Sequence, residues 1–212
     1  MRSRRNKLNL VAIGASAGGP SALANVFSKL PSGLTAAFVV SQHMPRGFTK
    51  QLSARLTTMS NVKVREAQSD DILQAGTALV TPGGHNMEVA EDGRIILEEA
   101  KQTPSPSIDI MMKSAASSYG PRCVGVLMTG MLHDGVLGMK AIKEAGGVTI
   151  AQDESSSLVF GMNKSAIQAG AVDTVVHVSD IALTIVDSLL GVSREQAKIR
   201  FARSTGLSSS FW

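Results

Sequence analysis

Residues 8–20, LNLVAIGASAGGP, constrain the fold of this chain more than any other stretch. Residues 10–13 form a short apolar run of the kind that buried parallel strands show. A turn rich in glycine and alanine follows, and after Pro20 apolar residues recur at helical spacing as far as Leu30. The sequence therefore predicts a strand that passes through a tight turn into a helix, with Ser16 on the turn.

Residues 14–18 fit the G-x-S-x-G pattern of a nucleophile elbow. Small neighbours leave the hydroxyl of Ser16 open to a substrate, and backbone N–H groups at the start of the next helix can face an oxyanion. A glycine-rich turn of this type also cradles phosphates, although the spacing is neither G-x-G-x-x-G nor a P-loop. A plain turn with a bystander serine is the third interpretation, and the turn alone does not decide among them.

The rest of the chain alternates strand-like and helix-like segments. The expected strands are residues 10–13, 36–42, 62–66, 78–81, 124–128, 148–151 and 174–178; the expected helices are 21–30, 47–59, 107–118, 136–145, 163–169 and 180–190, the last with Asp180 as N-cap. Residues 87–97, with a turn at 91–93, indicate a hairpin. The predicted fold is α/β: a doubly wound, mostly parallel sheet flanked by helices, with a small antiparallel hairpin added.

The expected organisation is a basic N-terminal segment (1–8), one catalytic domain (9–191) and a flexible tail (192–212). Much of the basic charge lies in the two end segments, and the modest basic bias of the chain, with a net charge of +4, suits an acidic partner surface. Aromatic residues make up only 4% and no basic stripe is interleaved with them, which argues against a nucleic-acid partner.

No apolar stretch reaches the ~20 residues of a membrane span, so no membrane insertion is expected. The single cysteine, Cys123, excludes an internal disulfide, fits a reducing cytoplasm and is expected to be a buried thiol. Four scattered histidines give no metal-ligand spacing, and no cofactor or metal is expected.

Three polar residues follow strands of the predicted sheet. Ser16 follows the first strand, His43 the second, and Asp134 the strand at 124–128. Ligands and catalytic groups collect at the carboxyl ends of parallel strands, so these three belong to one edge. A serine needs an imidazole to take its proton and a carboxylate to orient that imidazole, so the set suits nucleophilic catalysis. The alternatives are that His43 ends a strand and that Asp134 is only a turn residue before a helix.

The other histidines are weaker candidates. His133 adjoins Asp134 and competes as the base. His85 also follows a strand and could line the cleft, whereas His177 is expected to be structural.

Five blocks carry a family resemblance: residues 14–19 (GASAGG), 42–49 (QHMPRGFT), 106–109 (PSID), 129–135 (TGMLHDG) and 159–162 (VFGM). In this order and spacing they resemble the catalytic domain of the chemotaxis methylesterase CheB, over residues 9–190. The resemblance implies a cytoplasmic enzyme that hydrolyses glutamate methyl esters on the cytoplasmic helices of chemotaxis receptors, releases methanol and deamidates certain receptor glutamines. It implies Ser16 as nucleophile, His43 as base and Asp134 as the orienting carboxylate.

The resemblance also places Ala17 and Met131 beside the oxyanion, with chemoreceptors as partners and a receiver domain or signalling kinase as further partners. The family usually has threonine at position 17 and glycine at position 132, where this chain has Ala17 and Leu132. Two other functions stay open: a serine hydrolase of other small esters or amides, and a non-catalytic Rossmann-like signalling module.

Overall fold

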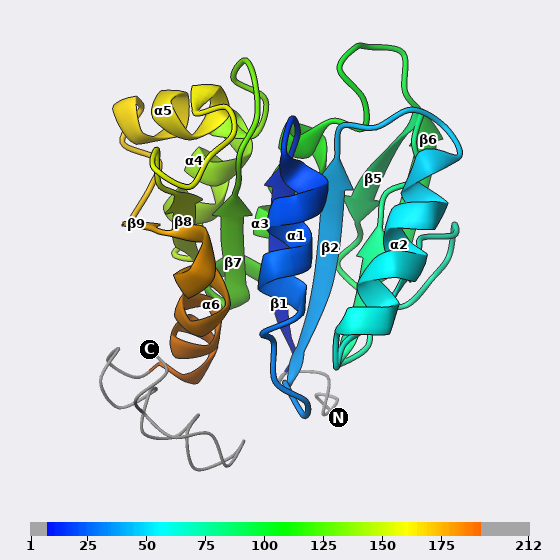
Figure 1. Cartoon of the computed structure of the whole chain (residues 1–212). Coiled ribbons are helices and arrows are strands. Elements are labelled where there is room, and N and C mark those ends of the chain that lie inside the picture. The colour runs from blue at the N-terminus through cyan, green and yellow to red at the C-terminus, as the bar shows by residue number, and fades with distance from the viewer. Residues whose placement is uncertain (1–7, 192–212) are drawn as a thin grey trace.

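The computed structural model describes residues 8–191 (Figure 1). At its centre is a seven-stranded sheet in the order β3-β4-β2-β1-β7-β8-β9, and each neighbouring pair is parallel. The strands are β1 (Asn9–Ala15), β2 (Ala36–Gln42), β3 (Lys63–Glu66), β4 (Thr77–Val80), β7 (Cys123–Leu127), β8 (Val148–Gln152) and β9 (Thr174–Val176). A separate antiparallel pair is formed by β5 (His85–Val89) and β6 (Ile95–Glu99). The predicted doubly wound sheet with an added hairpin is confirmed.

Helices cover both faces of the sheet, because alternate residues of each buried strand point to opposite sides. The helices are α1 (Gly19–Phe27), α2 (Phe48–Met59), α3 (Ile108–Tyr119), α4 (Val136–Glu144), α5 (Gly161–Gln168) and α6 (Ile181–Leu190). In β1, Val11 and Ile13 pack with α1, α2 and α6. Leu10 and Ala12 pack on the other face with α3, α4, α5 and the hairpin. The result is a three-layer molecule (Figure 1).

The strand order reverses direction at β1. From β1 the chain first adds β2 on one side, and it later returns to place β7 on the other. In an open parallel sheet, such a reversal leaves a crevice outside the carboxyl ends of the two diverging strands. The loops that follow β1, β2 and β7 therefore meet at one edge.

The observed elements differ from the predicted ones mainly at their ends. Helix α1 begins at Gly19 and not at residue 21, since a proline is tolerated in the first helical turn. Strand β9 stops at Val176 and gives way to one 3₁₀ turn, Val178–Asp180. Asp180 stands at the N-cap of α6, as predicted, but its side chain makes no capping hydrogen bond.

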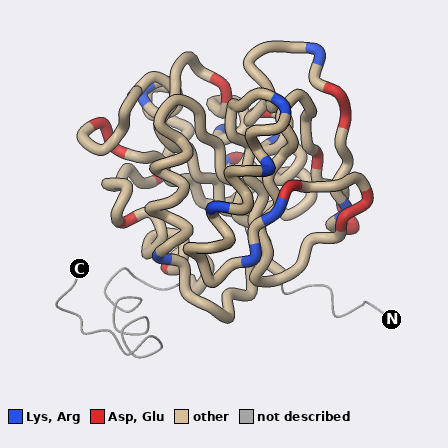
Figure 2. Tube along the Cα trace, turned by 45° about the vertical axis from the view of Figure 1, so that its right-hand side comes forward, with Lys and Arg blue, Asp and Glu red and all other residues tan. Residues whose placement is uncertain are grey.

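Residues 1–7 and 192–212 lie outside the described residues, so the basic N-terminal segment and the flexible tail stay predictions. Basic and acidic residues are both spread along the described part of the trace in Figure 2. Cys123 is buried as expected, and burial raises the pKa of its thiol to about 12. Within residues 8–191 no helix combines the length and the apolar character that a bilayer crossing needs.

Candidate active site

Three loops at the carboxyl edge of the sheet carry the side chains that the sequence analysis singled out. Ser16 directly follows β1, His43 directly follows β2, and Asp134 lies in the loop between β7 and α4. The turn after the serine passes through Gly18, whose φ of 81° is a left-handed conformation that glycine adopts readily. This turn leads at once into α1, so the serine stands at the sheet edge before the helix begins.

The imidazole of His43 bridges the other two side chains. Its Nδ1 lies 3.1 Å from Ser16 Oγ, and its Nε2 lies 2.8 Å from Asp134 Oδ2. The side chains of His43 and Asp134 are 9% and 14% exposed, so their contact is largely shielded from water. In this arrangement a neutral imidazole donates Nε2–H to the carboxylate and accepts the serine proton at Nδ1.

The carboxylate of Asp134 is also held by the start of α3. Backbone N–H groups of Ile108 and Asp109 donate to its two oxygens at 2.8 and 3.0 Å, and the hydroxyl of Ser107 lies 3.4 Å from Oδ1. A helix N-terminus stabilises an anion through its free N–H groups and its dipole. No role for these helix-starting residues was predicted from the sequence, although Ser107 as N-cap of α3 was the available signal.

Two neighbouring carboxyl groups are shifted in opposite directions. Burial raises the pKa of Asp134, but the hydrogen bond from His43 and the two from the start of α3 outweigh it, and the pKa is lowered overall. Burial raises the pKa of Asp109, whose carboxylate accepts a 2.7 Å hydrogen bond from the N–H of Gly138, and the nearby charge of Asp134 adds to the rise. Asp134 is thus held as an anion beside the imidazole.

The loop after β7 braces the main chain of the serine. Ser16 N–H donates to the carbonyl of Thr129 at 2.9 Å, and the Thr129 hydroxyl donates to the carbonyl of Ala17 at 2.8 Å. At Gly130 a Cβ atom would lie 2.6 Å from Ser16 Cβ and would also collide with Met162 Sδ. Only glycine therefore lets this loop approach the serine so closely.

Two backbone N–H groups near the serine are free to bind an oxyanion. Within residues 8–191, the N–H groups of Ala17 and Met131 have no hydrogen-bond acceptor, whereas that of Gly130 is taken by the carbonyl of Val159 at 2.9 Å. These are the two positions named in the sequence analysis. Replacing threonine by Ala17 leaves the main-chain donor in place.

Leu132 adopts a left-handed backbone conformation, with φ of 66°. The family resemblance implies glycine here, which takes up this conformation without a penalty. Leu132 therefore carries backbone strain at the position where the resemblance implies glycine.

An open cleft lies beside the serine and the imidazole. It has a volume of about 590 Å³, and its lining residues are Ser16, Ala17, Gly18, Pro20, Gln42, His43, Met44, Pro45 and Phe48. A second, smaller hollow of about 270 Å³ adjoins Asp134 on the side of residues 102–104. Ser16 and His43 of the hydrogen-bonded triad are therefore reachable from solvent, while the carboxylate of Asp134 is held by the protein.

The other histidines take no part in the hydrogen-bonded triad of Ser16, His43 and Asp134. His133 is exposed and lines the smaller hollow, but it makes no hydrogen bond to Ser16. His85 opens β5 and does not line the cleft, and the exposed His177 bonds to the hydroxyl of Ser179 at 2.8 Å. The described residues contain no group of three or more His, Cys, Asp or Glu side chains placed to hold a metal ion.

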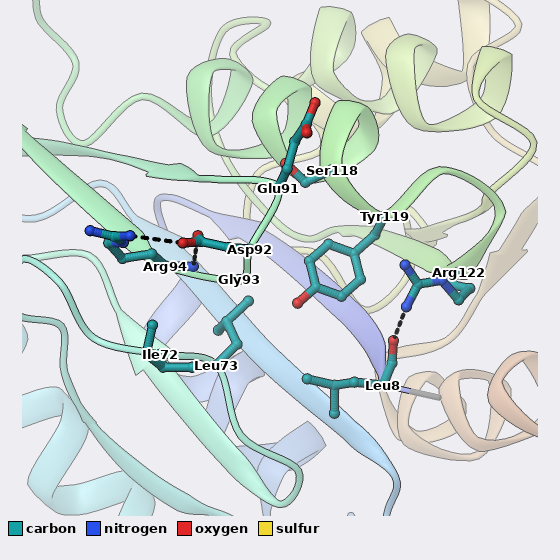
Figure 3. A pocket seen from close by; sticks show the side chains of 10 residues that line it. All are labelled: Leu8, Ile72, Leu73, Glu91, Asp92, Gly93, Arg94, Ser118, Tyr119 and Arg122. Carbon is teal, nitrogen blue, oxygen red and sulfur yellow. Dashed lines mark hydrogen bonds and ion pairs between the residues drawn. The ribbon is translucent and has the colours of Figure 1, made fainter. Parts of the chain in front are cut away.

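Another cavity, of about 600 Å³, lies at the amino ends of β1 and β7 (Figure 3). The ring of Tyr119 forms part of its wall under the guanidinium of Arg122, 5.0 Å from the ring centre. Arg122 also donates to the carbonyl of Leu8 at 2.7 Å. None of the residues that line this cavity belongs to the triad of Ser16, His43 and Asp134.

The fold and the site together define an α/β protein with the side-chain series of a serine hydrolase. Comparison with known proteins narrows the class: the CheB methylesterase family model matches residues 11–185, and the chain belongs to that family. The crystal structure of the *Thermotoga maritima* CheB methylesterase catalytic domain matches with a TM-score of 0.80 and 35% identity, over 84% of this chain and 96% of that one.

Curated relatives carry the name protein-glutamate methylesterase/protein-glutamine glutaminase. The protein from *Moorella thermoacetica* is 45% identical over 194 residues, which cover 89% of this chain and 46% of the relative. The one from *Pyrococcus abyssi* is 45% identical over 181 residues, covering 83% and 49%. This chain thus spans about half the length of the curated relatives it matches.

Proposed function

We propose that this chain is a protein-glutamate methylesterase that hydrolyses glutamate methyl esters on chemoreceptors and releases methanol. The observation that carries the proposal is the imidazole of His43, hydrogen-bonded to Ser16 Oγ at one nitrogen and to Asp134 at the other. Family membership supplies the substrate class, and relatives named for both activities support glutamine deamidation at the same site.

In the first half of the reaction, His43 Nδ1 takes the proton of Ser16 Oγ as the oxygen attacks the γ-carbonyl carbon of the ester. The carbonyl oxygen becomes an oxyanion, held by the N–H groups of Ala17 and Met131. Asp134 stabilises the imidazolium. As the C–O bond to the methoxy group breaks, His43 returns the proton and methanol leaves, which leaves an acyl-enzyme on Ser16.

In the second half, water attacks the acyl-enzyme and His43 takes a proton from that water. The bond from the acyl carbon to Ser16 Oγ then breaks, and the serine recovers its proton from the imidazolium. The product is the glutamate side chain as a free acid. Glutamine passes through the same acyl-enzyme with ammonia as the leaving group.

The methyl esters in this proposal lie on cytoplasmic receptor helices, so the proposed location of the enzyme is the cytoplasm. A receiver domain or a signalling kinase is the proposed source of regulation, by the same family resemblance. The cleft beside Ser16 is open enough to admit a side chain presented by a protein surface.

The proposal is tested by incubating the protein with a methylated receptor fragment and measuring methanol. The wild-type chain is expected to release methanol, and Ser16→Ala is expected to lose more than about 10³-fold in kcat, because the nucleophile is gone. Release of methanol by Ser16→Ala at the wild-type rate contradicts the assignment.

Two further outcomes separate the alternatives. Hydrolysis of short generic esters without any release from the receptor fragment favours a hydrolase of small substrates. A chain that neither hydrolyses esters nor reacts with a fluorophosphonate probe at Ser16 favours the non-catalytic module.

A further inference from the structure

Gln42 is the last residue of β2 and lies between the nucleophile and the base. Its side chain is 1% exposed. The side-chain Nε2 donates to the carbonyl oxygen of Ser16 at 2.8 Å and to the carbonyl oxygen of His43 at 3.0 Å. Because both partners are acceptors, the amide has one workable orientation, with its NH₂ toward them. One buried side chain thus ties together the main chains of the two residues that exchange a proton.

The carbonyl of Ser16 belongs to the same peptide unit as the N–H of Ala17. A peptide unit is planar and trans, so its C=O and N–H point in opposite directions. Fixing the carbonyl toward Gln42 therefore aims the Ala17 N–H away from it, as an oxyanion donor requires. A hydrogen bond accepted at the carbonyl also polarises the peptide and strengthens its N–H as a donor.

The other end of the same amide is confined by Gly19. The Oε1 atom of Gln42 faces this glycine, and a Cβ atom there would collide with Oε1 and lie 2.8 Å from Cδ. The N–H of Gly19 in turn donates to the carbonyl of Ser16 at 2.9 Å. The glycine thus leaves room for the amide in the one position from which it reaches both carbonyls.

We propose that Gln42 is a positioning residue for this reaction: it aims the Ala17 N–H at the developing oxyanion and fixes His43 relative to Ser16. The proposal rests on the esterase function proposed above. It gives Gln42 no contact with the reacting atoms. The expected signature is therefore a lower kcat with little change in KM, because Gln42 reaches the wall of the cleft with only 1% of its surface exposed and offers a bound substrate little contact.

The first variants remove the donor while keeping the size of the side chain. Gln42→Met and Gln42→Glu are expected to lower kcat on the methylated receptor fragment about 10- to 100-fold, with KM within about twofold of wild type. The rate of fluorophosphonate labelling at Ser16 is expected to fall in parallel. The Glu variant should be the slower one, since a carboxylate faces two carbonyl oxygens without a proton to donate.

Gly19→Ala tests the same contact from the other side. Alanine favours a helix more than glycine does, so this variant is expected to fold. Its methyl group would collide with the Gln42 amide and would also lie 2.9 Å from Ala15 Cβ, so the thermal midpoint is measured beside kcat. With the amide displaced, kcat should fall as it does for Gln42→Met.

The matched control is Thr81→Val. Thr81 is as buried as Gln42, and its hydroxyl bonds to Ser41 Oγ on β2 at 2.9 Å without contacting Ser16 or His43. The Thr81→Val variant is expected to have a lower thermal midpoint than the wild-type chain and the same kcat.

Unchanged kcat in Gln42→Met and Gly19→Ala overturns the proposal. A rise in KM without a fall in kcat in these variants also overturns it. So does a loss of kcat in Thr81→Val as large as that in Gln42→Met. In each of these cases the proposed function stands, because the wild-type chain is active. A wild-type chain that is inactive toward both receptor fragment and probe overturns the proposed function, and the role of Gln42 with it.

Discussion

At the scale of the residue, Leu132 shows how this chain accommodates a departure from its family. Asp70 and Leu132 are the only non-glycine residues between positions 8 and 191 with a positive φ. A left-handed conformation costs an L-residue about 1–2 kcal/mol, and Leu132 is 59% exposed, so burial offsets little of that cost. The strain lies two positions before Asp134.

Leu132→Gly is therefore expected to stabilise the fold by about 0.5–1 kcal/mol, after allowance for the greater freedom of glycine in the unfolded chain. Denaturant unfolding measures the change. The control is Leu137→Gly, which removes a similarly exposed leucine (55%) from α4 and is expected to destabilise by up to about 1 kcal/mol. A loss of stability in both variants contradicts the strain argument.

At the scale of the element, α3 contributes main-chain hydrogen bonds to the candidate site. Its first backbone N–H groups bind the carboxylate of Asp134, and the side chain of Asp109 ties it to the N–H of Gly138 in α4. The Asp109 carboxyl is half-buried in doing so. A carboxyl whose pKa is raised in the folded state disfavours folding above its ordinary pKa, and this effect disappears at pH values below it.

Asp109→Asn keeps an oxygen acceptor for the N–H of Gly138 and removes the half-buried charge. It is expected to raise the thermal midpoint at neutral pH, with an advantage that shrinks as the pH falls through the raised pKa of Asp109 and is gone below the ordinary carboxyl value of 3.8. Asp92→Asn is the comparison. The pKa of Asp92 is lowered, first by the Arg94 side chain, so removing this charge should cost stability at neutral pH and little in acid. If both variants change the thermal midpoint at neutral pH in the same direction, the electrostatic explanation is wrong.

The sequence predicted the type of each of these elements well, and their ends less well. Strand β2 matches its predicted bounds, because an apolar run fills residues 36–40 and the strand stays buried through Ser41 and Gln42. Helix α5 begins two residues early, at Gly161, since the N–H of that residue bonds to the carbonyl of Gly130 in the loop after β7. That contact joins distant parts of the chain and leaves no local pattern.

The same limit applies to the candidate site. Strand-end placement predicted that Ser16, His43 and Asp134 would meet, because that rule depends only on parallel topology. Their roles stay predictions. The two hydrogen bonds of Gln42 could not be foreseen, since they depend on how a buried amide is oriented between two loops.

At the scale of the whole molecule, both cores and the candidate site lie within residues 8–191. A protein trimmed to these residues is expected to keep the thermal midpoint within a few degrees and kcat/KM within about twofold, because the described cores and the candidate site are retained. Calorimetry and the methanol assay check this. A large loss of activity at an unchanged midpoint would instead give one of the removed ends a part in substrate recognition.

The strand order has a consequence for how activity returns when the unfolded chain refolds. His43 and Asp134 are 91 residues apart in sequence and meet only after β7 has docked against β1. Contacts of such long sequence separation form slowly, because the intervening loop must close first. During refolding, the recovery of methanol release should therefore lag behind the recovery of helical circular dichroism. The delay between the two signals then measures how long β7 takes to dock against β1.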